Sequence, residues 1–182
     1  GPDDRAGPRV SVRRMVVGTA LGRTGALFAV AVVLSTALAT SGAATPGSQR
    51  LIGRLRGDAA SDANQFVALT NQLRASVGRA PLTVDAGLTG IAAQWAAHLA
   101  AVGSLSHNPS LAGEVTANWL KLGENVGTGG SVPIIHQAFV NSPEHYANLV
   151  DPSFEYIGVA VAYAGGALWV TEDFMQVAAA PT

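Results

Sequence analysis

Apolar residues recur at helical spacing in three segments of the chain. The first segment predicts a helix between the N-cap residue Asp62 and Gly78, and the second predicts a helix between Asp85 and Gly103. A third helix is predicted over 133–141. The apolar stripes of the first two helices are Phe66, Leu69, Leu73 and Val77, and Leu88, Ile91, Trp95, Leu99 and Val102.

After Pro152 the apolar period changes to a value close to two. Residues 156–163 and 167–174 flank a turn that contains two glycines, and this pattern predicts a β-hairpin. We interpret the glycine-rich stretch 127–130 as another turn. Helices first and a hairpin last predict an α+β domain in which helices pack on an antiparallel sheet.

The first 44 residues have a different pattern. No charged residue occurs between Arg23 and Arg50, and this interval contains the apolar run 26–39, which small residues follow. Arginines before a run of this length are typical of a secretory signal peptide, here with a start at Met15. Serine and threonine dilute the run too soon for the ~20 apolar residues of a membrane helix. We therefore expect cleavage and no membrane span in the mature protein, with an uncleaved anchor as the alternative.

The rest of the chain divides into a spacer, a body and a tail. Residues 45–61 hold Pro, Gly, Ser and Arg without a sustained period, and we interpret them as a linker or a loosely attached arm. The globular domain is expected over 62–177, and a short tail over 178–182. A chain of 182 residues fits one domain more easily than two.

Charge and cysteine content exclude several classes of function. Residues 45–182 hold six basic and ten acidic residues, a net charge of −4. A body with one lysine and no basic stripe argues against binding to nucleic acid or to an anionic membrane surface. The absence of cysteine from the sequence excludes disulfides, thiolate metal ligands and thiol nucleophiles.

The four histidines lie in two kinds of segment. His98 and His136 lie on predicted helices. We interpret His98 as a structural residue at the core or its boundary, and His136 as structural or merely exposed. His107 follows the second helix and His145 lies in a loop or short turn, where functional side chains concentrate. Glu124 lies between these two in sequence, in a Gly-Glu-Asn segment. Two imidazoles and one carboxylate suit a divalent-metal site or acid–base catalysis, if the fold brings them together.

Six segments in order along the chain resemble the CAP superfamily of cysteine-rich secretory, antigen 5 and pathogenesis-related proteins. The resemblance is to its cysteine-free bacterial branch of SCP-like extracellular proteins, and it covers 62–176. The segments are 69–74 with 80–82, 106–107, 123–125, 141–149, 157–161 and 169–174.

The resemblance implies a three-layer α-β-α sandwich, with a small antiparallel sheet between helices and a shallow cleft. In the family this cleft holds a His/Glu tetrad, sometimes with a divalent metal. His107 and Glu124 match its first histidine and first glutamate, and His145 matches a histidine of the bacterial branch. The expected cleft residues are His107, Glu124, Asn125, Ser142, Glu144, His145 and Glu172.

The sequence departs from the family pattern at three positions. Phe139 replaces the usual tryptophan and Glu144 the usual glycine, while Ser142 stands near the second glutamate of eukaryotic members. Glu144 or Glu172 would then have to supply the second carboxylate. If a metal binds, we expect zinc on His107 and His145, with Glu124 in support.

The resemblance leaves three functions open. The first is a secreted or envelope-associated monomeric module that binds a lipid, a sterol-like small molecule or a peptide. The second is a metal-assisted hydrolase that uses His107, His145 and Glu124. The third is a non-catalytic interaction protein of the cell envelope. We favour the binding module over an enzyme, because no residue of the body resembles an activated nucleophile.

Overall fold

The computed structural model describes residues 11–17 and 46–178. In this part of the chain the strands form one sheet in the order β1-β3-β5-β4-β2. β2 pairs with β4 in parallel, and the other neighbours are antiparallel. The elements are β1 (Ser11–Val17), α1 (Pro46–Ser76), β2 (Thr83–Val84), α2 (Ala86–Val102), α3 (Leu111–Glu114), β3 (Trp119–Gly129), α4 (Val132–Asn141), α5 (Pro143–Leu149), β4 (Tyr156–Ala164) and β5 (Ala167–Val177).

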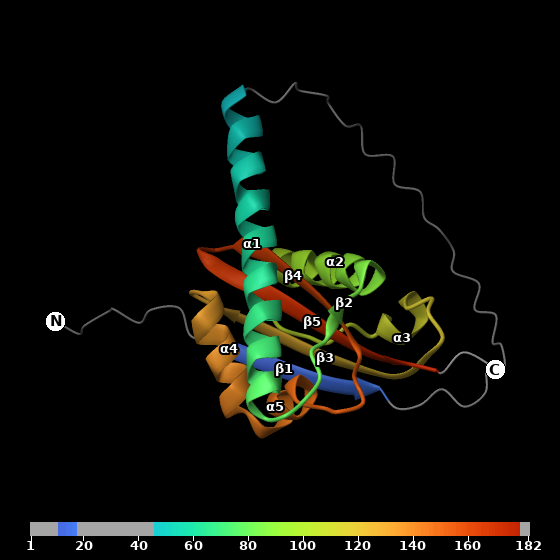
Figure 1. Ribbon diagram of the computed structural model, residues 1–182. Coiled ribbons are helices and arrows are strands. Elements are labelled where there is room, and N and C mark those ends of the chain that lie inside the picture. The colour runs from blue at the N-terminus through green and yellow to red at the C-terminus, as the bar shows by residue number, and fades with distance from the viewer. Residues whose placement is uncertain (1–10, 18–45, 179–182) are drawn as a thin grey trace.

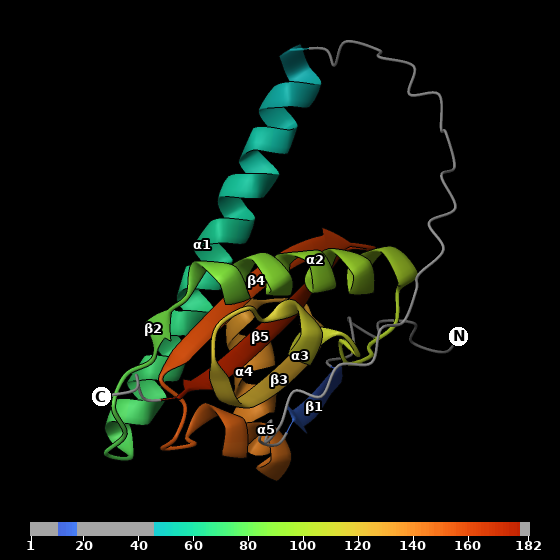
Figure 2. The same cartoon turned by 90° about the vertical axis from the view of Figure 1, so that its right-hand side faces the viewer.

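Helices cover both faces of this sheet (Figure 1, Figure 2). On β4, Ile157 and Val159 pack in a core cluster with Phe66 of α1. Ala160 points to the other face and packs against Ala92 and Ala96 of α2. Helices α4 and α5 lie on the same face as α1. The expected three-layer α-β-α sandwich is therefore confirmed.

The C-terminal hairpin forms as predicted. β4 and β5 pair in register from Tyr156 opposite Met175 to Ala164 opposite Ala167. Gly165 and Gly166 form the turn with φ of 59° and 72°. Two consecutive positive φ values define the hairpin turn whose twist matches that of the strands, and glycine adopts them without strain.

Helix α2 has the predicted ends. Asp85 is its N-cap and accepts a hydrogen bond from the Leu88 amide at 2.8 Å, and Gly103 ends it in the left-handed conformation. Its buried face differs from the prediction, because Val102 is exposed, whereas Ala92 and Ala96 are buried. Small residues let the helix approach the sheet closely: a Cβ on Gly158 would lie 2.3 Å from the Leu88 carbonyl carbon.

Three predictions of secondary structure were wrong. Helix α1 begins at Pro46 rather than after Asp62, so 46–61 are helical, and the upper part of α1 extends beyond the sheet (Figure 1). The glycines of 127–130 do not form a turn inside a loop, because β3 continues to Gly129. The segment with His145 is the short helix α5 rather than a loop. No sequence pattern had indicated β3.

The predicted signal peptide lies mostly outside the described residues. Its apolar run falls within 18–45, and the start proposed at Met15 falls inside β1. Within 11–17 and 46–178, no helix combines the length and the apolar character that crossing a membrane requires. Cleavage therefore stays a prediction.

Trp169 is a core residue as predicted, but Trp95 is only partly buried. The Trp95 indole donates a hydrogen bond to the Ser106 carbonyl at 2.9 Å, and its ring stacks on the exposed His98. We expect Trp95→Ala to lower the free energy of unfolding by about 2 kcal/mol, less than for a fully buried tryptophan. Urea denaturation measures this loss; a value above ~4 kcal/mol would show that the indole is a core side chain.

Candidate functional site

The Gly-Glu-Asn segment lies in β3, where successive side chains point to opposite faces of the sheet. Asn125 shares its face with Gly123 and Gly127, and a Cβ on Gly127 would lie 2.9 Å from Phe139 of α4. Glu124 points to the other face, which α2 and α3 cover. The candidate site residues therefore form two clusters, one on each side of the sheet.

The first cluster, which we call the α2-side cluster, consists of His107, Asn108, Glu124 and Asp173. Nδ1 of His107 lies 2.6 Å from Oε1 of Glu124. The Asn108 amide donates to both oxygens of the same carboxylate, at 3.1 and 3.3 Å. Glu124 is fully buried, whereas the His107 side chain is 22% exposed. A buried carboxylate thus orients an imidazole that solvent can reach.

Asp173 is a member of this cluster that the sequence analysis missed. It pairs with Glu124 across β3 and β5, it is fully buried, and neither carboxylate oxygen has a hydrogen-bond partner among the described residues. Burial, and then the charges of Glu124, Glu114 and Glu172, raise the pKa of Asp173 well above its usual value. The site therefore favours the protonated form of Asp173 more strongly than water does. Two adjacent acidic residues in an otherwise apolar strand were the available signal.

The second cluster, which we call the α5-side cluster, consists of Asn125, Ser142, His145, Asn148 and Glu172. Asn125 donates from Nδ2 to Oε2 of Glu172 at 3.2 Å and accepts at Oδ1 from Asn148 Nδ2 at 3.0 Å. Glu172 is fully buried, and this burial raises its pKa to about 8, although the hydrogen bond from Asn125 acts in the opposite direction. Asn125, Asn148 and Glu172 thus form a buried network of hydrogen bonds.

Helices α4 and α5 position the histidine of the α5-side cluster. Nδ1 of His145 lies 2.7 Å from Oγ of Ser142, and the ring stacks on Phe139 with centroids 5.2 Å apart. The neighbouring Glu144 is exposed. His136 on α4 is buried, which lowers its pKa and agrees with the predicted structural role. His98 is exposed, so its predicted place at the core was wrong.

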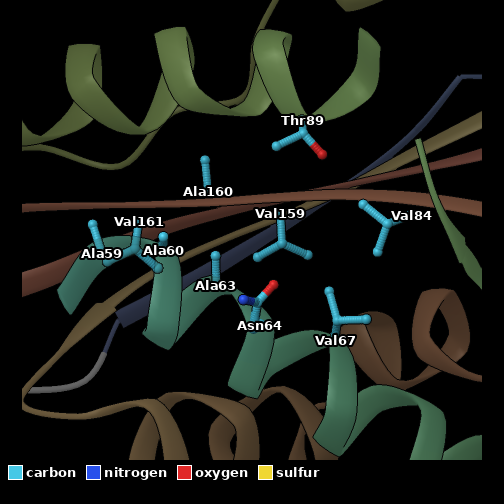
Figure 3. A pocket seen from close by; sticks show the side chains of 10 residues that line it. All are labelled: Ala59, Ala60, Ala63, Asn64, Val67, Val84, Thr89, Val159, Ala160 and Val161. Atoms are coloured by element: carbon cyan, nitrogen blue, oxygen red, sulfur yellow. The ribbon is translucent and has the colours of Figure 1, made fainter. Parts of the chain in front are cut away.

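A third feature lies at the edge of the sheet opposite β1, where β2 covers only Tyr156 and Ile157 of β4. Beyond β2, helices α1 and α2 flank the uncovered edge of β4 and form a groove of about 230 Å³ (Figure 3). We call it the β4-edge groove. Its lining is Ala59, Ala60, Ala63, Asn64, Val67, Val84, Thr89, Val159, Ala160 and Val161. No pattern in the sequence had predicted this groove.

A family model for the cysteine-rich secretory proteins, CAP, matches residues 67–174. The chain belongs to the CAP family. The match includes both clusters and ends at Phe174, within β5. The predicted family membership is thereby confirmed.

Solved structures share the fold of this CAP domain. An outer surface protein of Borrelia burgdorferi matches with a TM-score of 0.61 and 17% identity, over 65% of this chain and 94% of its own. A Bacillus anthracis extracellular protein with an SCP domain matches with a TM-score of 0.58 and 23% identity, over 75% of this chain and 45% of its own. A Staphylococcus aureus cysteine-rich secretory protein matches with a TM-score of 0.53 and 22% identity, over 65% of this chain and 39% of its own. The chain thus spans less than half the length of the last two proteins. No curated protein sequence matches the chain.

The predicted zinc site does not fit the described residues of this CAP domain. The sheet separates the Glu124 and His107 side chains from the cluster that contains His145. Among residues 11–17 and 46–178, no group of three or more His, Cys, Asp or Glu residues is placed to hold a metal ion. Zinc in proteins usually takes three or four protein ligands, and His107 with Glu124 supplies two.

Proposed function

We propose that this CAP domain is an extracellular binding module and that the β4-edge groove holds the hydrocarbon chain of a small amphiphile. The observation that carries this proposal is the groove lining, in which eight of the ten residues are alanine or valine. A solvent-accessible apolar groove on a folded protein is a characteristic ligand site. The signal-peptide pattern supports an extracellular location, as does the CAP family.

The size of the groove favours a single alkyl chain. Its 230 Å³ lie below the ~300–1,000 Å³ that are usual for pockets of drug-sized ligands. A sterol ring system would therefore remain largely outside it. At one end, the Tyr163 hydroxyl donates to Asp62 at 2.6 Å and joins β4 to α1.

Charge near the groove favours an uncharged or cationic head group. Asn64 is the exposed polar side chain of the lining and can donate or accept a hydrogen bond. Asp58 and Asp62 lie on the same part of α1 and would repel a carboxylate. We therefore expect 1-octanol to bind more tightly than octanoate.

Calorimetric titration of 1-octanol into the wild type and two variants tests the proposal. Ala63→Leu places a larger side chain in the groove and is expected to weaken binding at least ~10-fold, a loss of about 1.4 kcal/mol. The matched control Ala68→Leu changes an exposed position of the same helix and is expected to leave binding unchanged. Equal weakening by both variants, or no effect of Ala63→Leu, would contradict binding in this groove.

A second candidate function is acid–base catalysis by His107. The observation that favours it is the contact with Glu124, which holds Nδ1 and leaves Nε2 as the atom that can accept a proton. Hydrolysis of p-nitrophenyl acetate by the wild type, lost in His107→Gln, would support this function. The same rate in both proteins would exclude a catalytic role for this imidazole in ester hydrolysis.

A further inference from the structure

A strand from the N-terminal segment completes the sheet. β1 pairs with β3 in antiparallel register, from Ser11 opposite Thr128 to Val17 opposite Leu122 (Figure 1). Without β1, this side of β3 would be an open edge with unpaired amides and carbonyls, which readily accepts another extended chain.

The domain contacts both the backbone and a side chain of β1. Asn148, fully buried on α5, donates from Nδ2 to the Met15 carbonyl at 3.3 Å and also to Asn125 Oδ1. The Met15 side chain packs on the opposite face against a buried cluster that includes Leu111 and Leu122. An added strand is recognised through its backbone and through its side chains. Here the Asn148 side-chain amide binds the backbone of β1, and the apolar cluster binds the Met15 side chain.

β1 is separate in sequence from the domain to which it binds. Residues 18–45 lie between β1 and α1, and the CAP family match begins only at residue 67. The sequence pattern also places β1 before the predicted cleavage site. The segment that fills the edge of β3 is therefore not part of the matched domain.

We propose that the edge of β3 is a docking site for an extended basic peptide, and that residues 11–17 of this chain occupy it. The peptide adds as an antiparallel strand and places an apolar side chain where Met15 lies. The β1 sequence contains Arg13 and Arg14, and the helices on either side of β1 carry the exposed Glu114 and Glu144. Opposite charges favour the encounter and the orientation of such a peptide.

This site is distinct from the β4-edge groove of the proposed function. In the strand order β1-β3-β5-β4-β2 the two features lie at opposite edges of the sheet. Met15 pairs with Glu124, so the docked strand lies beside the α2-side cluster. Removal of residues 11–17 would expose the strand that carries Glu124 to a partner peptide.

The experiment compares two aspartate substitutions at adjacent positions of β1 in the full chain. Met15→Asp buries a charge in the apolar cluster and is expected to release β1. Val16→Asp is the matched control, because the Val16 side chain is 38% exposed on the other face. Amide hydrogen exchange should accelerate in Met15→Asp at those residues of 122–128 whose amides point to β1, and remain slow in the wild type and in Val16→Asp.

The second measurement is the binding of a labelled synthetic peptide with the sequence of residues 9–19, followed by fluorescence anisotropy. A tethered strand has an effective concentration of about 1 mM and competes with free peptide. We therefore expect the peptide to bind Met15→Asp at least ~10-fold more tightly than the wild type or Val16→Asp. A peptide that carries aspartate in place of methionine should not bind Met15→Asp.

Two results would overturn the proposal. The first is fast exchange of these β3 amides already in the wild type, which would show that the edge is not occupied. The second is a folded Met15→Asp protein, by circular dichroism, that binds the peptide no better than the wild type does. Neither result depends on octanol binding, so this proposal can fail while the proposed function stands.

Discussion

Arg74→Ala is expected to lower the free energy of unfolding by about 3–5 kcal/mol, enough to unfold a marginally stable domain. The Arg74 side chain is only 1% exposed, at the C-terminal end of α1. It donates to the carbonyls of Ala80, Leu149, Asp151 and Phe154, at distances of 2.7 to 3.3 Å. The guanidinium therefore ties α1 to the end of α5 and to the loop before β4, and its removal leaves these carbonyls without their donor.

Urea denaturation of the wild type, Arg74→Ala and Arg79→Ala measures this effect. Arg79 has the same charge and lies five positions further along the chain, but its side chain is exposed, so its replacement should change stability by less than ~0.5 kcal/mol. A loss below ~1 kcal/mol in Arg74→Ala would show that these carbonyls find other donors.

Glu172→Gln is expected to make the protein more stable at pH 8 and to leave it unchanged near pH 4.5. Burial raises the pKa of Glu172 from 4.5 to about 8, so the folded state binds the proton more tightly than the unfolded chain. Between these values the folded state holds more protons, and stability falls as the pH rises. At about 1.4 kcal/mol for each unit of pKa, the fall is of order 4 kcal/mol, and glutamine avoids it.

Thermal unfolding between pH 4.5 and 8 measures the difference in stability between the wild type and Glu172→Gln. The glutamine side chain of the Glu172→Gln variant keeps an oxygen that can accept the Asn125 hydrogen bond, so the network stays intact. Glu144→Gln is the matched control, because the exposed Glu144 side chain should give the wild-type profile. Asp173→Asn should also stabilise at high pH, since the pKa of Asp173 is raised by burial as well. Parallel profiles of Glu172→Gln and the wild type would contradict a protonated Glu172.

Local signals in the sequence were enough for the C-terminal hairpin and for α2. In both elements, individual residues fix the local backbone conformation. Gly165 and Gly166 adopt the positive φ values of the hairpin turn, and Asp85 and Gly103 cap the two ends of α2. The family motifs also mark contacts that hold the fold together. Asn71, in the first motif, bonds through its side chain to both the amide and the carbonyl of Leu82.

The sequence predicted the His107 and Glu124 pair but not the arrangement around it. β3 escaped detection because Gly123, Gly127 and Gly129 interrupt its apolar alternation. Glycine is required at two of these positions by close approach of Phe154 and Phe139, which is a tertiary contact. Without β3, strand alternation could not be applied, so the separation of Glu124 from the α5-side cluster was not foreseen.

The β4-edge groove could not be predicted from the sequence for a related reason. Its lining combines small residues from α1, β2, α2 and β4, and none of these segments has a motif of its own. The first part of α1 lacks an apolar period because it extends beyond the sheet (Figure 1). Only the packing of α1 and α2 against the uncovered edge of β4 brings the lining together.

Nuclear magnetic resonance of the ¹⁵N-labelled chain during titration with 1-octanol tests the central claim most directly. The amides of the groove lining on α1 and β4, from Ala59 to Val67 and from Val159 to Val161, are expected to shift and to saturate together. The amides of His107, Glu124 and His145 are expected to stay in place. Shifts centred on these three residues, with none in the groove lining at saturating octanol, would contradict the assignment of the groove as the ligand site.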